Sequence, residues 1–359
     1  MKRPTLYCAI TGHGFGHAVR TACIAHRVQQ LCPDVLIIFG TKSPRWLLES
    51  YLELPFIHRS VALDVGVVQA DSLQMDRTAT LQTLQGIYQN PDRLIATEAN
   101  YLINNRVDLV LADIPSLATA IAHRAEIPCW MSSNFGWDFI YQDWGDSFAD
   151  ITAQVRADYA QCDLLFRLPL AEPMSAFPHR VEAGLTGGDP RWSMAELRET
   201  FAVTAAKEKT ILLTFGGLGL QQIPYDGLAQ FPDWQFLTFD QQAPTLPNLK
   251  VIRDRRYRPV DLMPICGRVM SKPGFSTFSE ALRQDVPLIS LTRDGFAEAE
   301  ILLEGLRDYG HHQVVPHQQF FAGDWEFLQE SPQPPRLTTP LDKHGDRQIA
   351  EKIVDQIAP

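Results

Sequence analysis

The sequence predicts an α/β protein built from two doubly wound, Rossmann-like domains that face each other across a cleft. Three observations support this fold class. Strand and helix patterns alternate along the chain, which favours parallel sheets covered on both faces. The alternation begins anew in the second half, and each half opens with a buried strand that runs into a glycine-rich turn. The length of 359 residues suits two domains that each have their own core.

The first half of the chain predicts one complete domain. Strands are expected near residues 5–11, 35–39, 107–112, 128–132 and 163–167, and helices near 17–31, 44–52, 78–104, 116–125 and 147–160. Glycines at 184, 187 and 188, followed by Pro190, then predict a hinge. The first domain is therefore expected over residues 1–187.

The second half predicts another domain and a returning tail. Strands are expected near 210–215, 234–238, 249–252, 267–271 and 287–291, and helices near 259–265, 275–284 and 296–306. Residues 331–340 contain four prolines and predict an extended crossing segment. A last helix near 344–358 has an apolar face. These patterns place the second domain at 188–340 and a C-terminal helix, 341–359, back against the first domain.

Composition restricts the function classes. The formal net charge is −10, so nucleic acid and anionic lipid surfaces are not expected as partners. No apolar run reaches the length of a membrane span, and the stretch after the basic start ends at Thr11, so neither integral membrane association nor a signal peptide is expected. Six scattered cysteines without a Cys-x-x-Cys motif predict reduced core thiols in a cytoplasmic protein. The oligomeric state is left open.

The first glycine-rich turn reads Gly12-His13-Gly14-Phe15-Gly16-His17 and precedes an expected helix. Its spacing excludes a dinucleotide-binding dehydrogenase, because that fingerprint has its third glycine at the position of His17. The turn places the His17 imidazole at a helix N-terminus, which disfavours the imidazolium and predicts a neutral general base. A capping histidine without chemistry is the alternative. No metal is expected, because glycines separate His13 from His17 and no third ligand lies nearby in the sequence.

The second informative segment is Ser271-Lys272-Pro273-Gly274-Phe275-Ser276-Thr277-Phe278-Ser279-Glu280-Ala281. An apolar strand stops at the Pro-Gly pair, and small hydroxyl residues lead into a helix. Free backbone N–H groups, hydroxyls and the positive end of a helix dipole suit a diphosphate. Glu280, about one turn into that helix, is placed to accept hydrogen bonds from two vicinal ribose hydroxyls. An ordinary strand, turn and capped helix is the alternative.

The architecture and these segments resemble the GT-B class of nucleotide-sugar glycosyltransferases. Segment 272–280 is similar to the donor loop of the family 28 N-acetylglucosaminyltransferase of peptidoglycan synthesis. Most of the chain resembles the amino-terminal glycosyltransferase-like region of plant L-arabinokinase. The shared motifs are residues 12–17 with Arg20, Asn134-Phe135-x-Trp137-Asp138-Phe139-Ile140-Tyr141, Phe215-Gly216-Gly217, Tyr257-x-Pro259, Ser279-Glu280-Ala281 and Arg293-Asp294-x-Phe296. The sugar kinase module of the plant enzyme has no counterpart in the sequence, so sugar phosphorylation is not implied.

The resemblance implies a role for individual residues. His17 corresponds to the catalytic base of inverting enzymes, and Asp113 to the aspartate that orients it, although a helix N-cap is the alternative for Asp113. The expected donor-binding residues are Gly216, Gly217, Lys272, Gly274, Ser276, Thr277, Glu280 and Glu298. The expected acceptor or cleft residues are His13, Gly14, Gly16, Arg20, Asn134, Phe135, Trp137 and Asp138. No cofactor is implied beyond a nucleotide-sugar co-substrate, with UDP as the expected nucleotide.

Three features leave alternatives open. The family 28 enzymes hold the donor sugar with paired glutamines, whereas this chain has Phe296-Ala297-Glu298, so the transferred sugar, a hexose or an N-acetylhexosamine, is not fixed. The aromatic segment 135–141 is unusual for a loop and suits the faces of sugar rings, but a core anchor under the cleft would use the same residues. The arginines at 255, 256 and 258 favour a solvated charge run over contacts to a nucleotide.

The preferred interpretation is an inverting glycosyltransferase that moves a sugar from a UDP-sugar to an unidentified acceptor hydroxyl, of a small molecule or a glycan, with His17 as general base. A nucleotide-sugar epimerase of the same fold is the first alternative, with Glu298 and Asp113 as acid and base. A non-catalytic nucleotide-sugar-binding regulator is the second. A lipid-linked acceptor is disfavoured, because the acidic chain lacks a basic, apolar membrane-facing patch.

Overall fold

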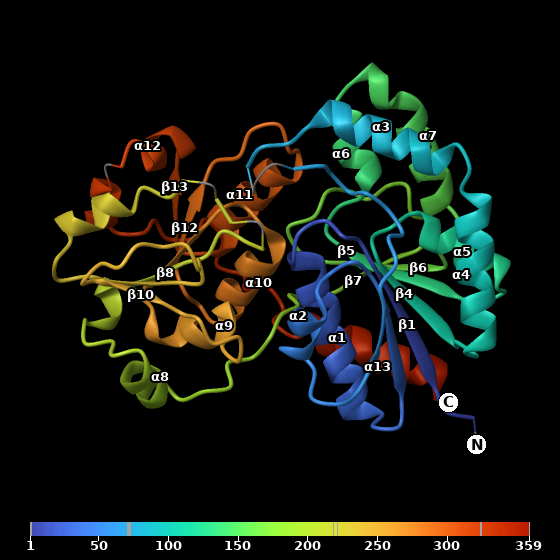
Figure 1. The fold of residues 1–359 in the computed structure, drawn as a ribbon, viewed down its shortest axis with the longest axis horizontal. Coiled ribbons are helices and arrows are strands. Elements are labelled where there is room, and N and C mark those ends of the chain that lie inside the picture. Colours follow the sequence, from blue (N-terminus) through green and yellow to red (C-terminus); the bar gives the residue numbers. More distant parts are fainter. Residues whose placement is uncertain (1, 70–72, 218, 221, 324, 359) are drawn as a thin grey trace.

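The computed structural model describes residues 2–69, 73–217, 219–220, 222–323 and 325–358. Leu218, within the glycine-rich turn that follows residue 215, therefore lies outside the described residues. Two parallel sheets form two domains that lie side by side (Figure 1). The predicted α/β class with two doubly wound domains is confirmed.

The N-terminal domain is built on a sheet with the strand order β3-β2-β1-β4-β5-β6-β7, all parallel. The strands are β1 (Thr5–Ile10), β2 (Leu36–Gly40), β3 (Ile57–Arg59), β4 (Leu109–Asp113), β5 (Cys129–Ser133), β6 (Leu164–Arg167) and β7 (Arg180–Glu182). Ile10 pairs with Asp113 in the register of β1 and β4. The first glycine-rich turn and Asp113 therefore leave the sheet at the same edge.

Helices cover both faces of this sheet. They are α1 (Gly16–Leu31), α2 (Arg45–Glu49), α3 (Arg77–Tyr88), α4 (Asp92–Asn104), α5 (Leu117–Arg124), α6 (Trp137–Asp143) and α7 (Ala149–Tyr159). The single helix expected over 78–104 is two helices, because Pro91 begins a new helix and disfavours helical geometry in the residue before it. The aromatic segment expected as a loop is helical from Trp137 onward.

The C-terminal domain has a parallel sheet in the order β10-β9-β8-β11-β12-β13. Its strands are β8 (Thr210–Leu213), β9 (Gln235–Thr238), β10 (Leu249–Val251), β11 (Arg268–Ser271), β12 (Leu288–Leu291) and β13 (His312–Val315). Its helices are α8 (Met194–Thr200), α9 (Pro259–Leu262), α10 (Phe275–Arg283), α11 (Glu298–Tyr309) and α12 (His317–Phe321). The N-terminal domain has one short 3₁₀ segment among the described residues, Asp146–Phe148. The C-terminal half has such segments at Lys207–Lys209, Tyr225–Gln230, Met263–Ile265 and Glu326–Gln329.

Helix α13 (Gly345–Ile357) returns to the N-terminal domain and packs along α1, as Figure 1 shows. Its apolar face, with Ile349 and Ile353 fully buried, joins the same core as α1. The start of the helix crosses the interdomain linker so closely that a Cβ at Gly345 would overlap the Gly184 carbonyl. The predicted return of the C-terminal helix is confirmed.

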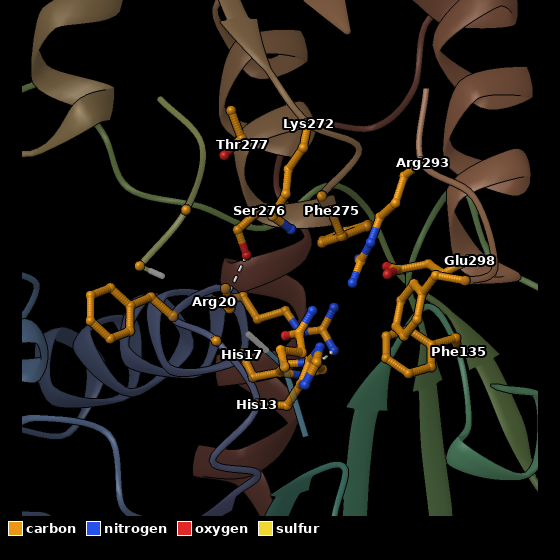
Figure 2. A pocket seen from close by; sticks show the side chains of 18 of the residues that line it. His13, His17, Arg20, Phe135, Lys272, Phe275, Ser276, Thr277, Arg293 and Glu298 are labelled. Atoms are coloured by element: carbon orange, nitrogen blue, oxygen red, sulfur yellow. Dashed lines mark hydrogen bonds between the residues drawn. The ribbon is translucent and has the colours of Figure 1, made fainter. Parts of the chain in front are cut away.

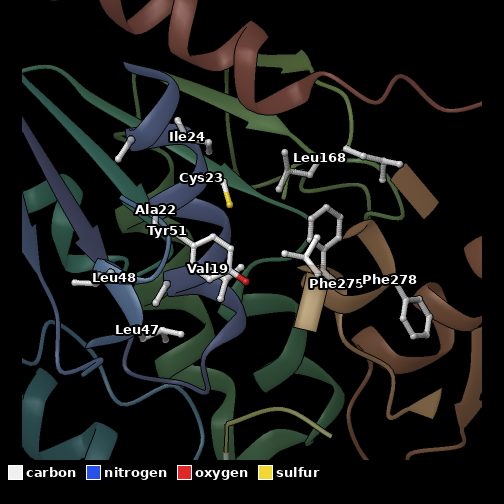
Figure 3. Close-up of a cluster of buried hydrophobic side chains, with 14 of the residues drawn as sticks. Val19, Ala22, Cys23, Ile24, Leu47, Leu48, Tyr51, Leu168, Phe275 and Phe278 are labelled. Atoms are coloured by element: carbon white, nitrogen blue, oxygen red, sulfur yellow. The ribbon is translucent and has the colours of Figure 1, made fainter. Parts of the chain in front are cut away.

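The two domains share an apolar core at the contact between α1 and α10. Val19 of α1 and Tyr51 face Phe275 and Phe278 of α10 in this cluster (Figure 3). All four side chains are buried. The domains are therefore packed together, and this closed arrangement sets the shape of the cavity between them. Within the described part of the chain, no helix combines the length and the apolar character needed to cross a membrane.

Candidate active site

A cavity of about 100 Å³ lies between the domains, at the carboxyl ends of the parallel strands (Figure 2). This is where open α/β sheets bind ligands. Its N-terminal-domain lining is His13, Gly14, Phe15, Gly16, His17, Arg20, Gln69 and Phe135. Its C-terminal-domain lining is Thr214, Gly216, Gly217, Lys272, Gly274, Phe275, Ser276, Thr277, Arg293, Phe296 and Glu298.

His17 and Asp113 form a buried pair on the N-terminal side. Helix α1 begins at Gly16, so His17 lies in its first turn, and Asp113 ends the neighbouring strand β4. His17 Nδ1 lies 2.8 Å from Asp113 Oδ1. An ionised carboxylate only accepts, so Nδ1 carries the proton and Nε2 has a free lone pair. Asp113 does not cap α5, whose N-cap residue is Ser116.

Arg20 completes the surroundings of Asp113. Its Nε donates to Asp113 Oδ2 and its Nη2 to Oδ1, both at 2.5 Å, while Thr21 Oγ1 donates to Oδ2 at 3.1 Å. Burial alone would raise the pKa of Asp113, but the charge of Arg20 and the contact with His17 hold it below its usual range. Asp113 is therefore an ionised carboxylate that lies behind His17 and does not line the cavity.

The two glycine-rich turns touch each other across the cavity. Ser276 Oγ, in the first turn of α10, donates to the Gly16 carbonyl at 2.7 Å. Gly217 lies under the Phe15 ring, where a Cβ would overlap the ring. The first turns of α1 and α10 thus both open onto the cavity, and each presents backbone N–H groups that no residue of its own helix accepts.

Cationic and imidazole groups concentrate on this cavity. Burial, reinforced by Arg293 and opposed by Glu298, lowers the pKa of Lys272 to about 7. Within the described residues its amine has no hydrogen-bond or ion-pair partner. Burial, His17, Arg293 and Lys272 together lower the pKa of His13 well below its usual value, and its Nδ1 accepts from the Val67 N–H at 3.3 Å. The site therefore offers an anion a half-buried amine and two helix N-termini.

Glu298 bridges the two domains at the cavity wall. It is the first residue of α11, and its Oε1 accepts from Asn134 Nδ2 at 2.8 Å. Asn134 Oδ1 in turn accepts from Arg20 Nη1 at 2.6 Å. Asn134 is fully buried behind this wall and does not line the cavity itself.

Glu280 lies away from the cavity in this closed arrangement. Its Oε1 accepts from the backbone N–H of Gly188 at 3.1 Å and lies 3.3 Å from the hydroxyl of Tyr51. Burial raises the pKa of Glu280 to about 7, although the Gly188 hydrogen bond and nearby arginines oppose this shift. A ribose contact would require Tyr51 and the linker to release this carboxylate.

Two further expected cleft residues, like Asn134, lie behind the cavity wall. Trp137 is buried beneath His13 and His17, and its Nε1 donates to Asp64 Oδ2 at 3.0 Å. Asp138 accepts from Arg156 Nε at 3.1 Å. Because α6 starts at Trp137, the side chains of Trp137, Asp138, Ile140 and Tyr141 are buried, and only Phe135 of segment 135–141 lines the cavity. Trp137 and Asp138 therefore fit the alternative in which the aromatic segment anchors the core under the cleft.

The structure adds residues that the sequence did not single out for the site. Phe15, Phe275, Arg293 and Phe296 line the cavity, and each belongs to a motif that had already been noted. Asp64 carried no such signal, because it lies in an irregular loop after β3. It is half-buried under the first glycine-rich turn, where Thr11 Oγ1 donates to it at 2.8 Å, and desolvation raises its pKa to about 6. Among the described residues, no group of three His, Cys, Asp or Glu side chains could hold a metal.

Comparison by sequence identifies one informative relative. No protein-family model matches the chain. L-arabinokinase from Arabidopsis thaliana is 30% identical over 329 residues, which cover 88% of this chain. The chain spans only 31% of the length of that relative. The likeness therefore concerns one region of a larger protein.

Comparison by structure identifies glycosyltransferases over nearly the whole chain. Arabidopsis thaliana UGT89C1 complexed with quercetin has a TM-score of 0.61 at 13% identity, covering 99% of this chain and 96% of that one. A UDP-glucosyltransferase from Polygonum tinctorium has a TM-score of 0.59 at 15% identity, covering 99% and 94%. UDP-glucose:anthocyanidin 3-O-glucosyltransferase in complex with UDP has a TM-score of 0.61 at 12% identity, covering 99% and 95%. The predicted resemblance is confirmed: the chain has the GT-B fold, two Rossmann-like domains with parallel sheets, that these glycosyltransferases share.

Proposed function

We propose that the protein is a glycosyltransferase that moves a sugar from a UDP-sugar to an acceptor hydroxyl with inversion at the anomeric carbon. One observation carries this proposal. The His17–Asp113 pair on the N-terminal side faces the turn of Lys272 and the first turn of α10 across one cavity. A base and an anion site thus lie opposite each other, in a fold found among UDP-glycosyltransferases.

The donor would lie against the C-terminal domain. The N–H groups of the first turn of α10, with the hydroxyls of Ser276 and Thr277, suit a diphosphate, and Lys272 supplies the positive charge. The glycines at 216, 217 and 274 let backbone approach the ligand closely. Glu298, at the cavity wall, is placed to accept from hydroxyls of the transferred hexose or N-acetylhexosamine.

The chemical step is a single displacement. His17 Nε2 takes the proton of the acceptor hydroxyl as its oxygen forms a bond to the anomeric carbon. The bond from that carbon to the phosphate oxygen breaks, and UDP leaves with the electron pair, stabilised by Lys272 and the helix N-terminus. Asp113 holds Nδ1–H of His17, which fixes the tautomer that this step needs. No redox cofactor or metal is required by these residues.

The epimerase alternative receives less support. It needs carboxylates that reach the sugar ring, but Asp113 is enclosed by Arg20, His17 and Thr21 behind the cavity wall. Glu298 would remain as a single acid or base. No observation favours a non-catalytic regulator, which stays as an outcome of the test below.

Binding and turnover test the proposal in sequence. Calorimetric titration should show that UDP binds, and slow hydrolysis of a UDP-sugar should provide a first measure of turnover with water as surrogate acceptor. His17→Ala should reduce turnover by roughly 10²–10⁴-fold and leave UDP affinity nearly unchanged. Binding without turnover by the wild type on a panel of UDP-sugars and acceptors would favour the regulator. Full turnover by His17→Ala would contradict the assignment of the base.

A further inference from the structure

Arg20 holds an unusual position for an arginine beside a catalytic base. It is only 2% exposed, and its guanidinium meets both oxygens of Asp113 at 2.5 Å. Nη2 also donates to Ser133 Oγ at 2.9 Å and lies 3.0 Å from Nδ1 of His17. Since Nδ1 is itself a donor, the last approach is a contact between Arg20 and His17 and not a hydrogen bond. The guanidinium of Arg20 therefore contacts both Asp113 and His17.

This contact has an electrostatic consequence. A buried carboxylate next to an imidazole favours the imidazolium, because opposite charges within about 4–6 Å stabilise each other. An imidazolium cannot accept a proton, so an uncompensated Asp113 would orient His17 but would also reduce the fraction of His17 that is ready to accept one. A guanidinium bound to both carboxylate oxygens cancels that charge and leaves the hydrogen bond to Nδ1 intact.

We propose that Arg20 is a positioning residue that fixes Asp113 against His17 Nδ1 while cancelling the charge of Asp113, so that His17 keeps its Nδ1–H tautomer and Nε2 is available to accept a proton. The proposal deepens the proposed function and rests on it for the role of His17 as base. Arg20 itself does not take part in proton transfer.

Other groups that face His17 do not replace Arg20 in this role. The ring of His13 lies 6.3 Å away, centre to centre, and is held neutral by its lowered pKa. Asp64 below the turn is shared between Thr11 and Trp137. The remaining charged groups of the cavity come from the C-terminal domain and are Lys272, Arg293 and Glu298.

The position of Arg20 also depends on the other domain. Its guanidinium lies over the Phe275 ring of α10, 5.2 Å from the ring centre. Through Asn134 it is linked to Glu298 of α11. The packed domains thus add contacts from α10 and α11 to the side chain that holds Asp113.

The direct test follows the protonation of His17 by NMR in protein labelled at histidine Cε1. The His17 signal is identified by its loss in His17→Gln. In Arg20→Gln this signal should titrate about 1–3 pH units higher than in the wild type, because Asp113 then stabilises the imidazolium. In Arg20→Gln combined with Asp113→Asn it should return toward the wild-type midpoint, since both charges are gone. Arg27→Gln, at an arginine in a later turn of α1 that is ion-paired with Asp346 of α13, should leave the midpoint unchanged.

Activity supplies a second readout. The acidic limb of the pH–rate profile for UDP-sugar hydrolysis should move to higher pH in Arg20→Gln, with kcat reduced at neutral pH and KM little changed. Arg20→Lys keeps the charge but not the paired hydrogen bonds, so it should titrate near the wild type yet lose turnover. This variant keeps the proposal testable if Arg20→Gln does not fold.

An unchanged His17 midpoint in Arg20→Gln would overturn the charge-cancelling role, and full turnover by Arg20→Lys would overturn the positioning role. The NMR measurement requires neither donor nor acceptor. Failure of the wild type to bind UDP would therefore contradict the proposed function, whereas the His17 midpoint in Arg20→Gln would still test the role of Arg20.

Discussion

Lys272 is a half-buried side chain at the proposed donor site. Its amine faces the cavity with no partner among the described residues, and its pKa is lowered to about 7, below the ordinary value of 10.5. An ammonium that is partly removed from water and has no counter-charge costs free energy, and a diphosphate bound here would supply that counter-charge.

We expect UDP binding to take up a proton above pH 7. The diphosphate favours the ammonium, so the pKa of Lys272 rises on binding, and affinity should fall by up to tenfold per pH unit above 7. Calorimetry at pH 8 to 9, in buffers of different ionisation enthalpy, measures the protons taken up. Lys272→Arg should bind UDP without this uptake, because arginine is charged throughout that range. Equal uptake by Lys272→Arg would assign the proton to another group.

At the scale of elements, α10 is held between the catalytic cavity and the linker. Its first turn meets Gly16, and one turn later Glu280 is bound by Tyr51 and Gly188. Arg258, from the C-terminal domain, lies over the Tyr51 ring with its guanidinium 4.7 Å from the ring centre. The segment after α2 therefore covers the carboxylate that was expected to bind ribose.

Removing the Tyr51 hydroxyl that covers Glu280 and removing the Glu280 carboxylate itself should change UDP affinity in opposite directions. Glu280→Ala loses a charge-assisted acceptor worth about 1.5–3 kcal/mol, so UDP affinity should fall at least about tenfold. Tyr51→Phe frees Glu280 of a competing hydroxyl and should raise UDP affinity modestly. Titration of both variants with UDP and 2′-deoxy-UDP compares the ribose contributions directly. Equal affinity of Glu280→Ala and wild type for UDP would show that the ribose is bound elsewhere.

Helix α13 is the second element whose role can be measured. Ile353 is fully buried against the α1 side of the core, whereas Lys352 beside it is exposed. Ile353→Ala should destabilise the N-terminal domain by about 2–5 kcal/mol through the cavity that it leaves. Lys352→Ala should change stability by less than about 0.5 kcal/mol. Chemical denaturation of both variants measures the difference, and similar midpoints would place the helix outside the cooperative core.

At the scale of the whole molecule, the closed domains leave too little room for the proposed donor. The cavity measures about 100 Å³, whereas pockets that enclose a drug-sized ligand measure roughly 300–1,000 Å³. The contact of Ser276 with Gly16 and the close packing of the Phe15 ring on Gly217 close the site from both sides. The domains must separate for a UDP-sugar to enter.

A disulfide across the cleft should prevent this opening. A Cβ at Gly16 would lie 3.7 Å from Cβ of Ser276, within the separation of about 3.5–4.5 Å that a disulfide requires. Oxidised Gly16→Cys/Ser276→Cys should therefore lose UDP binding, and a reductant should restore it in the same sample. The reduced protein and each single variant serve as controls. UDP binding of wild-type strength by the fully cross-linked protein would mean that the closed state admits the donor.

The sequence by itself determined the fold class, the order of the long elements and both glycine-rich turns, because buried parallel strands and amphipathic helices leave periodic patterns. It also predicted that His17 and Asp113 lie at the same edge of one sheet, since each lies at or after the carboxyl end of a strand that can be recognised in the sequence. The periodic pattern did not separate α3 from α4, because the boundary depends on Pro91. The short strands β3, β7 and β13 were not predicted, because their stability comes from neighbouring strands. The placement of Trp137 and Asp138 behind the wall also needed the structure, because the same aromatic residues suit a core or a sugar.

Only the tertiary structure decided how the two halves meet. Arg20 with Asp113, Glu298 with Asn134 and Tyr51 with Glu280 join residues that lie 93, 164 and 229 positions apart. No local pattern encodes such pairs, because each depends on the angle at which two sheets and their helices pack. The long-range contacts decide which charges are cancelled, which carboxylate is covered and how much room is left between the domains.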